Sequence, residues 1–169
     1  MSDAVDCDGL PGERRRIVIA DDHEPTRVLL RTLIELEGMQ VVGEARDGSE
    51  AVALALEHEP DLVLLDINMP RLDGLGAAEI IRARRPSIGL FLHSGEPLDA
   101  ALERAAALEV PVADKRDLHI TIQQLAETPA DAERWTAVPT LVQQAAAASS
   151  PALFPRGRPS WSRGERASA

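Results

Sequence analysis

Acidic side chains follow two apolar runs of the chain at the point where each run stops. The run 62–65 (LVLL) ends at Asp66, and the run 17–20 (IVIA) ends at Asp21 and Asp22. Apolar residues without polar alternation indicate strands covered on both faces, as in parallel sheets between helices. Ligands bind in the crevice beyond the carboxyl ends of such strands. The sequence therefore predicts three carboxylates in one ligand-binding crevice.

A hydroxyl and an amine follow two further predicted strands and are expected at the same edge. Ser94 comes after the strand 88–92, and Lys115 comes after the strand 110–113. Of the 18 Lys and Arg residues, Lys115 alone is lysine, which suggests that an ammonium is required there. Clustered carboxylates repel each other and favour a bound cation, and Mg²⁺ suits oxygen ligands where phosphate is handled. A carboxylate facing a metal, an ammonium and a hydroxyl is suited to phosphoryl transfer.

Strands and helices alternate through residues 14–127, which predicts an α/β fold with a doubly wound, five-stranded parallel sheet. The alternating strand 40–45 is expected at one edge, and Pro111 favours an edge position for the fifth strand. We expect the strands at 17–20, 40–45, 62–65, 88–92 and 110–113, and the helices at 24–36, 47–59, 74–85, 97–108 and 117–127.

The composition narrows the class of protein. The chain has 169 residues, a single cysteine and a net charge of −10, so we expect one domain, no internal disulfide and no general affinity for nucleic acid. No apolar run is long enough to span a membrane and no signal peptide is evident, which favours a cytoplasmic protein.

Both ends of the chain are predicted to lie outside the domain. Residues 1–13 read as a disordered leader, and residues 128–169 as a disordered tail rich in Pro, Ala and Arg. A docking helix over 132–148 is a weaker alternative, because Pro139 interrupts it. The tail is too short and too poor in large apolar residues for a DNA-binding output domain.

The pair Asp21-Asp22, the run 66–74 (DINMPRLDG), Ser94 and Lys115 together resemble the receiver domain of two-component response regulators. The resemblance covers roughly residues 14–127. It implies the flavodoxin-like (βα)5 fold with strand order 2-1-3-4-5. It further implies a cytoplasmic signalling protein that catalyses only its own phosphorylation and dephosphorylation.

Roles for individual residues follow from the same resemblance. Asp66 would accept a phosphoryl group from a histidine kinase or a phosphotransfer protein. Asp22, Asp66 and the backbone carbonyl of Asn68 would bind Mg²⁺ directly, and Asp21 would act through water. Ser94 and Lys115 would contact the phosphoryl oxygens. Signalling would then pass through protein contacts, with a homodimer left open.

The sequence departs from the family pattern where the output surface is expected. Receivers usually carry Phe or Tyr three positions before the lysine, and the ring moves together with the hydroxyl residue. Here Val112 occupies that position, so the switch formed by Ser94 and Val112 is expected to be blunted. This departure keeps a second interpretation open, namely a pseudo-receiver that signals without phosphorylation.

Other classes of function fit less well. Phosphatases of the haloacid dehalogenase type need a second Asp two positions after the nucleophile, where this chain has Asn68. Each acid taken singly also has a structural explanation, because acids at strand ends cap the helices that follow. The four histidines are scattered without metal-ligand spacing and are interpreted as non-catalytic: His23, His58, His93 and His119. A modulating role at the pocket rim is left open for His23 and His93.

Overall fold

The computed structural model describes residues 14–95 and 99–127, with the backbone alone for 99–101. The strands are β1 (Arg16–Ala20), β2 (Gln40–Ala45), β3 (Leu62–Asp66), β4 (Gly89–Ser94) and β5 (Val112–Asp114). The helices are α1 (Glu24–Leu36), α2 (Gly48–His58), α3 (Gly74–Arg84), α4 (Asp99–Ala107) and α5 (Leu118–Glu127), with the 3-10 turn η1 (Lys115–Asp117) before α5. The predicted leader, the tail and the helix at 132–148 lie outside the described residues.

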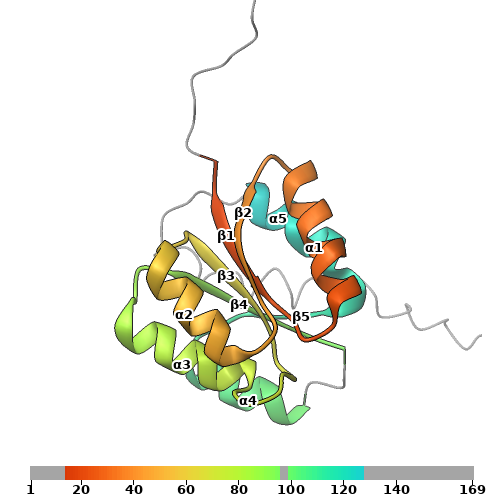
Figure 1. Cartoon of the computed structure of the whole chain (residues 1–169). Coiled ribbons are helices and arrows are strands. Elements are labelled where there is room, and N and C mark those ends of the chain that lie inside the picture. Colours follow the sequence, from red (N-terminus) through yellow and green to blue (C-terminus); the bar gives the residue numbers. More distant parts are fainter. Residues whose placement is uncertain (1–13, 96–98, 128–169) are drawn as a thin grey trace, which may run out of the picture.

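All five strands pair in parallel in the order β2-β1-β3-β4-β5, so the predicted fold class and strand order are confirmed (Figure 1). The apolar strands β1, β3 and β4 occupy the centre, and β2 and β5 form the edges, as predicted. The register pairs Ala20 with Leu65 and Asp66 with His93. The carboxyl ends of β1, β3 and β4 therefore meet at one edge of the sheet.

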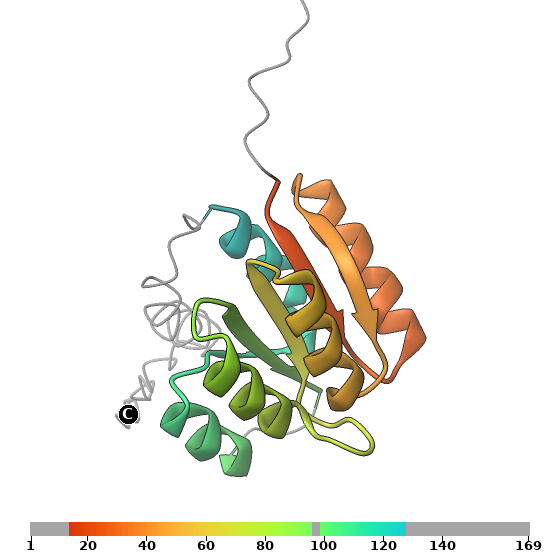
Figure 2. The same cartoon turned by 60° about the vertical axis from the view of Figure 1, so that its left-hand side comes forward.

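Helices cover both faces of the sheet, which explains why its central strands are apolar along most of their length. Helices α1 and α5 pack on one face, and α2, α3 and α4 lie on the other (Figures 1 and 2). Alternate residues of each strand belong to different cores: in β1, Ile17 and Ile19 pack with α1 and α5, whereas Val18 and Ala20 pack with α2 and α3. This division follows from the two-residue repeat of a strand.

The fifth strand begins later than its apolar pattern suggests. It covers Val112–Asp114 rather than 110–113, so Pro111 precedes the strand instead of lying within it. Pro111 lacks an N–H for the ladder, but its carbonyl accepts a hydrogen bond from the backbone N–H of Leu92 at 2.9 Å. The shift brings Lys115 directly to the end of the strand.

Helix α2 begins at a buried cap that also contacts the loop after β3. Asp47 is 2% exposed, and its Oδ1 accepts hydrogen bonds from the backbone N–H groups of Ser49 at 2.8 Å and Glu50 at 2.9 Å. Its Oδ2 pairs with the guanidinium of Arg71, a residue whose φ of 65° lies in the left-handed region. The cap thus connects α2 to the segment that follows Asp66.

We expect Asp47→Ala to lower the free energy of unfolding by about 1 kcal/mol, because two backbone donors lose their acceptor. Urea denaturation of both proteins would measure the loss. Arg71→Ala is the matched control: the Arg71 side chain is 71% exposed, so its ion pair alone should contribute less than the cap. An equal loss in the two variants would contradict this explanation.

Candidate functional site

The carboxylates of Asp21 and Asp66 and the ammonium of Lys115 meet at the C-terminal ends of the strands. Lys115 Nζ lies 2.8 Å from Asp21 Oδ2 and 3.1 Å from Asp66 Oδ2. Asp21 is 0% and Asp66 2% exposed. The ammonium therefore links the ends of β1 and β3 from its position after β5, which accounts for a lysine at this point of an arginine-rich chain.

The surroundings of Asp66 favour its neutral form. Burial raises the pKa of its carboxyl group from 3.8 to about 6, and the negative charge of Asp21 adds to the rise. Hydrogen bonding and charge from Lys115, together with the backbone N–H of Asn68, act in the opposite direction but only partly offset it. At neutral pH most Asp66 side chains are ionised, so the group can serve as a nucleophile there.

Lys115 carries the counter-charge of the pocket. Burial lowers the pKa of its ammonium, but hydrogen bonds to Asp21 and Asp66 outweigh burial and raise the pKa above 10.5. The ammonium thus stays charged wherever the two carboxylates are ionised. One ammonium against two carboxylates leaves the cluster with a net charge of −1.

The other predicted site residues lie around this cluster. Ser94 is the last residue of β4 and is 3% exposed, one position after the residue that pairs with Asp66. Asn68 follows Asp66 at the surface, and the Asp22 side chain is also exposed. Val112 is 5% exposed and packs in the core with α2 and α3. The ligand and switch roles of these residues remain predictions.

His93 lies buried beside Asp21 rather than at the rim of the pocket, where a modulating role was left open. Its side chain is 0% exposed, and its Nδ1 lies 3.8 Å from Asp21 Oδ2. Burial lowers the pKa of the imidazole to about 3, and the charge of Lys115 adds to the effect, so the ring is neutral at physiological pH. Its position at a strand end, directly before Ser94, was the available signal, because strand ends meet here.

Asp21, Asp66 and His93 form the one possible metal-binding group found among the described residues. Single ligand atoms from Asp21, Asp66 and His93 all lie within 4.8 Å of one another. Asp66 Oδ1 is buried and has no hydrogen-bond partner within the described part of the chain. A buried acceptor without a partner is costly, so the oxygen ligands present fit a bound cation such as Mg²⁺.

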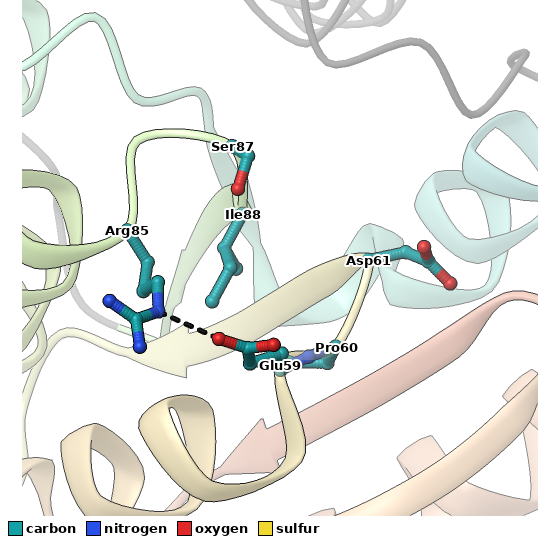
Figure 3. A pocket seen from close by; sticks show the side chains of 6 residues that line it. All are labelled: Glu59, Pro60, Asp61, Arg85, Ser87 and Ile88. Carbon is teal, nitrogen blue, oxygen red and sulfur yellow. Dashed lines mark hydrogen bonds and ion pairs between the residues drawn. The ribbon is translucent and has the colours of Figure 1, made fainter.

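A hollow of about 320 Å³ lies at the amino ends of β3 and β4, at the opposite end of these strands from Asp66. Its lining comes from the segments that precede β3 and β4, as Figure 3 shows: Glu59, Pro60, Asp61, Arg85, Ser87 and Ile88. Arg85 Nε pairs with Glu59 Oε1 at 2.9 Å. Asp61 points away from that pair (Figure 3) and accepts a hydrogen bond from the backbone N–H of Arg16 at 2.7 Å. This hollow contains none of the predicted site residues.

Curated relatives match the domain but extend beyond it. The transcriptional regulatory protein PdtaR of Mycobacterium tuberculosis is 49% identical over 96 residues, which are 56% of this chain and 47% of that protein. A protein-glutamate methylesterase/protein-glutamine glutaminase of Haloarcula marismortui is 40% identical over 90 residues, or 52% of this chain and 24% of that enzyme. The chain thus spans half or less of the length of these relatives.

Solved structures agree with the fold. The receiver domain of the putative response regulator NarL from Mycobacterium tuberculosis has a TM-score of 0.60 at 28% identity, covering 69% of this chain and 99% of that one. The response regulator domain of CheB from Thermotoga maritima also has a TM-score of 0.60, at 26% identity, covering 69% of this chain and 98% of that one.

No helix in the described residues is long and apolar enough to cross a membrane.

The family described as "Response regulator receiver domain" matches residues 17–111. That match includes the ends of β1, β3 and β4, where Asp21, Asp66 and Ser94 lie. Since the matched segment is more than half of the chain and the fold agrees, the protein belongs to the family of response regulator receiver domains.

Proposed function

We propose that the protein is a phosphoacceptor response regulator of a two-component system or phosphorelay. Asp66 accepts a phosphoryl group from a histidine kinase or a phosphotransfer protein, and the modified domain signals through contacts with other proteins. The observation that carries this proposal is the placement of Asp66. Its carboxylate is buried at the end of β3, lies 3.1 Å from an ammonium and keeps one oxygen without a hydrogen-bond partner among the described residues.

The transfer follows from the groups at the site. A carboxylate oxygen of Asp66 attacks the phosphorus of a phosphohistidine, a P–O bond forms, and the P–N bond breaks so that the electron pair returns to the imidazole of the donor. The Lys115 ammonium offsets charge on the phosphoryl oxygens. Ser94 donates its hydroxyl hydrogen to one of these oxygens. In the free protein Lys115 already contacts Asp66, so little rearrangement is needed to stabilise the product.

Mg²⁺ would be held by the carboxylates of Asp22 and Asp66 and by the backbone carbonyl of Asn68, with Asp21 acting through water. When bound, the ion supplies positive charge beside the transferred group. The exposed carboxylate of Asp22 and the buried Oδ1 of Asp66 are compatible with this role, because the first is accessible and the second has no hydrogen-bond partner among the described residues. The site modifies only its own aspartate and is not expected to turn over an external substrate.

A direct test is incubation with acetyl phosphate and Mg²⁺, followed by intact-protein mass spectrometry. We expect a mass gain of one phosphoryl group that hydroxylamine removes, because the product is an acyl phosphate. Asp66→Asn should show no gain. Asp61→Asn is the matched control, since Asp61 lies just before the same strand at its opposite end and should leave the gain intact.

The alternative is a pseudo-receiver that signals without phosphorylation. It is favoured by Val112, which is packed in the core and lacks a ring that can report the state of Ser94. Absence of any mass gain in the wild-type protein, under conditions that phosphorylate another receiver domain, would favour this alternative over phosphoryl acceptance. A gain that persists in Asp66→Asn would place the acceptor elsewhere.

A further inference from the structure

A buried histidine without hydrogen bonds lies beside the phosphoacceptor pocket. Neither ring nitrogen of His93 has a hydrogen-bond partner within the described residues, although the side chain is 0% exposed. Burying a polar group without a partner is unfavourable, because the group loses its hydrogen bonds to water and gains none in return. A neutral imidazole in such a place has a lone pair that can bind a cation. The position thus favours a partner that the described residues do not supply.

The distances around His93 suit a shared cation. Its Nδ1 lies 3.8 Å from Asp21 Oδ2, and one ligand atom each from His93, Asp21 and Asp66 lie within 4.8 Å of one another. Bonds from a transition metal to nitrogen and oxygen are roughly 2.0–2.2 Å long, so two ligands of one ion stand up to about 4 Å apart. The three groups therefore need only a small adjustment to bind the same ion.

The net charge of the cluster is compatible with that ion. Lys115 contacts Oδ2 of both carboxylates, whereas Asp66 Oδ1 has no hydrogen-bond partner in the described part of the chain. Two carboxylates and one ammonium carry a net charge of −1, which a divalent ion would reverse. Binding then uses the free oxygen of Asp66 and competes with Lys115 for Asp21.

We infer that His93 is a metal ligand and that the pocket accepts a divalent transition metal through His93, Asp21 and Asp66. This inference deepens the proposed function, because it concerns the metal of the phosphoacceptor pocket and rests on that pocket being a cation site. Mg²⁺ strongly prefers oxygen ligands, whereas imidazole nitrogen favours transition metals. A nitrogen ligand at this position therefore favours transition metals over Mg²⁺, and Mn²⁺ serves as the paramagnetic probe of that class.

Pulsed electron paramagnetic resonance of the full chain loaded with Mn²⁺ tests this inference without any phosphodonor. We expect modulation from a directly bound ¹⁴N nucleus, and its replacement by the ¹⁵N pattern when the protein is made with ¹⁵N-labelled histidine. This comparison requires no substitution, so it does not depend on whether a variant folds. Mn²⁺ that is bound through oxygen alone would overturn the inference.

Two variants identify the histidine. His93→Leu should abolish the nitrogen coupling and weaken Mn²⁺ binding at least about tenfold, while Mg²⁺ binding changes by less than about twofold. His23→Ala is the matched control, because His23 also adjoins Asp21, its backbone N–H lying 2.8 Å from Asp21 Oδ1, but its side chain is exposed. This control should keep the coupling. Coupling lost in His23→Ala and kept in His93→Leu would overturn the assignment.

The outcome is separable from that of the proposed function. A mass gain from acetyl phosphate with Mg²⁺, together with absent nitrogen coupling, would refute the role of His93 and leave Asp66 as the acceptor. Nitrogen coupling without any mass gain would support a metal-binding pseudo-receiver and refute phosphoryl acceptance.

Discussion

Gly74→Ala is expected to lower the free energy of unfolding by about 3 kcal/mol. Gly74 is the first residue of α3, and its backbone N–H donates to the carbonyl of Ile67 at 3.0 Å. A Cβ at this position would overlap the carbonyl oxygen of Asp66 and would lie 2.9 Å from its carbonyl carbon and 3.1 Å from Ile67 Cα. These atoms belong to the backbone, so a side-chain rotation cannot relieve the overlap.

The same substitution should reduce phosphoryl uptake in the fraction that remains folded, because the carbonyl it displaces belongs to the proposed acceptor. Urea denaturation measures the stability, and mass spectrometry after acetyl phosphate measures the uptake. Gly95→Ala is the matched control at the same edge of the sheet. The nearest atom to its added Cβ is Lys115 Cδ at 3.5 Å, an ordinary contact, so its stability should change by less than about 0.5 kcal/mol. Similar midpoints for Gly74→Ala and the wild type would contradict the steric argument.

The meeting of Asp21, Asp66 and Lys115 follows from the sequence because each residue ends a strand. Parallel strands bring their carboxyl ends to one edge whatever their order, so placing the strands was enough to place these residues. The strand order itself is not contained in the hydrophobic pattern. It followed only from the resemblance to receiver domains, and the structure confirms it.

The features that the sequence did not reveal depend on the direction of side chains rather than on position along the chain. Asp21 and Asp22 are adjacent, yet only Asp21 is buried against Lys115, because successive side chains at a strand end point to opposite sides. His93 was interpreted as non-catalytic because its position in the sequence shows only that it precedes Ser94, and the direction of its ring, which is fully buried, cannot be read from that position. The start of β5 was misplaced because apolar residues on both sides of Pro111 resemble a strand.

Asp66→Asn is expected to raise the free energy of unfolding at pH 8 by about 2 kcal/mol, while it abolishes phosphoryl uptake. The pKa of Asp66 is raised from 3.8 to about 6 in the folded protein, so the folded state holds its proton more tightly than the unfolded chain does. The contribution of Asp66 to stability is therefore complete below about pH 4 and is lost as the pH rises through about 6. Each pKa unit corresponds to about 1.4 kcal/mol, and the value of about 2 kcal/mol includes a discount for partial screening by solvent.

The amide introduced by Asp66→Asn would resemble the protonated acid and stay uncharged at every pH, so the difference between variant and wild type should vanish near pH 4 and grow to its full size by pH 8. Urea denaturation at pH 4, 6 and 8 would measure this growth. Asp61→Asn, which removes an exposed carboxylate just before the same strand, should not reproduce the gain of stability at pH 8. A variant less stable than the wild type at pH 8 would mean that the ion pair with Lys115 outweighs burial and repulsion from Asp21. The expected sign instead implies that the wild-type protein gives up stability at neutral pH to keep an ionised nucleophile next to a second buried carboxylate, as functional sites commonly do.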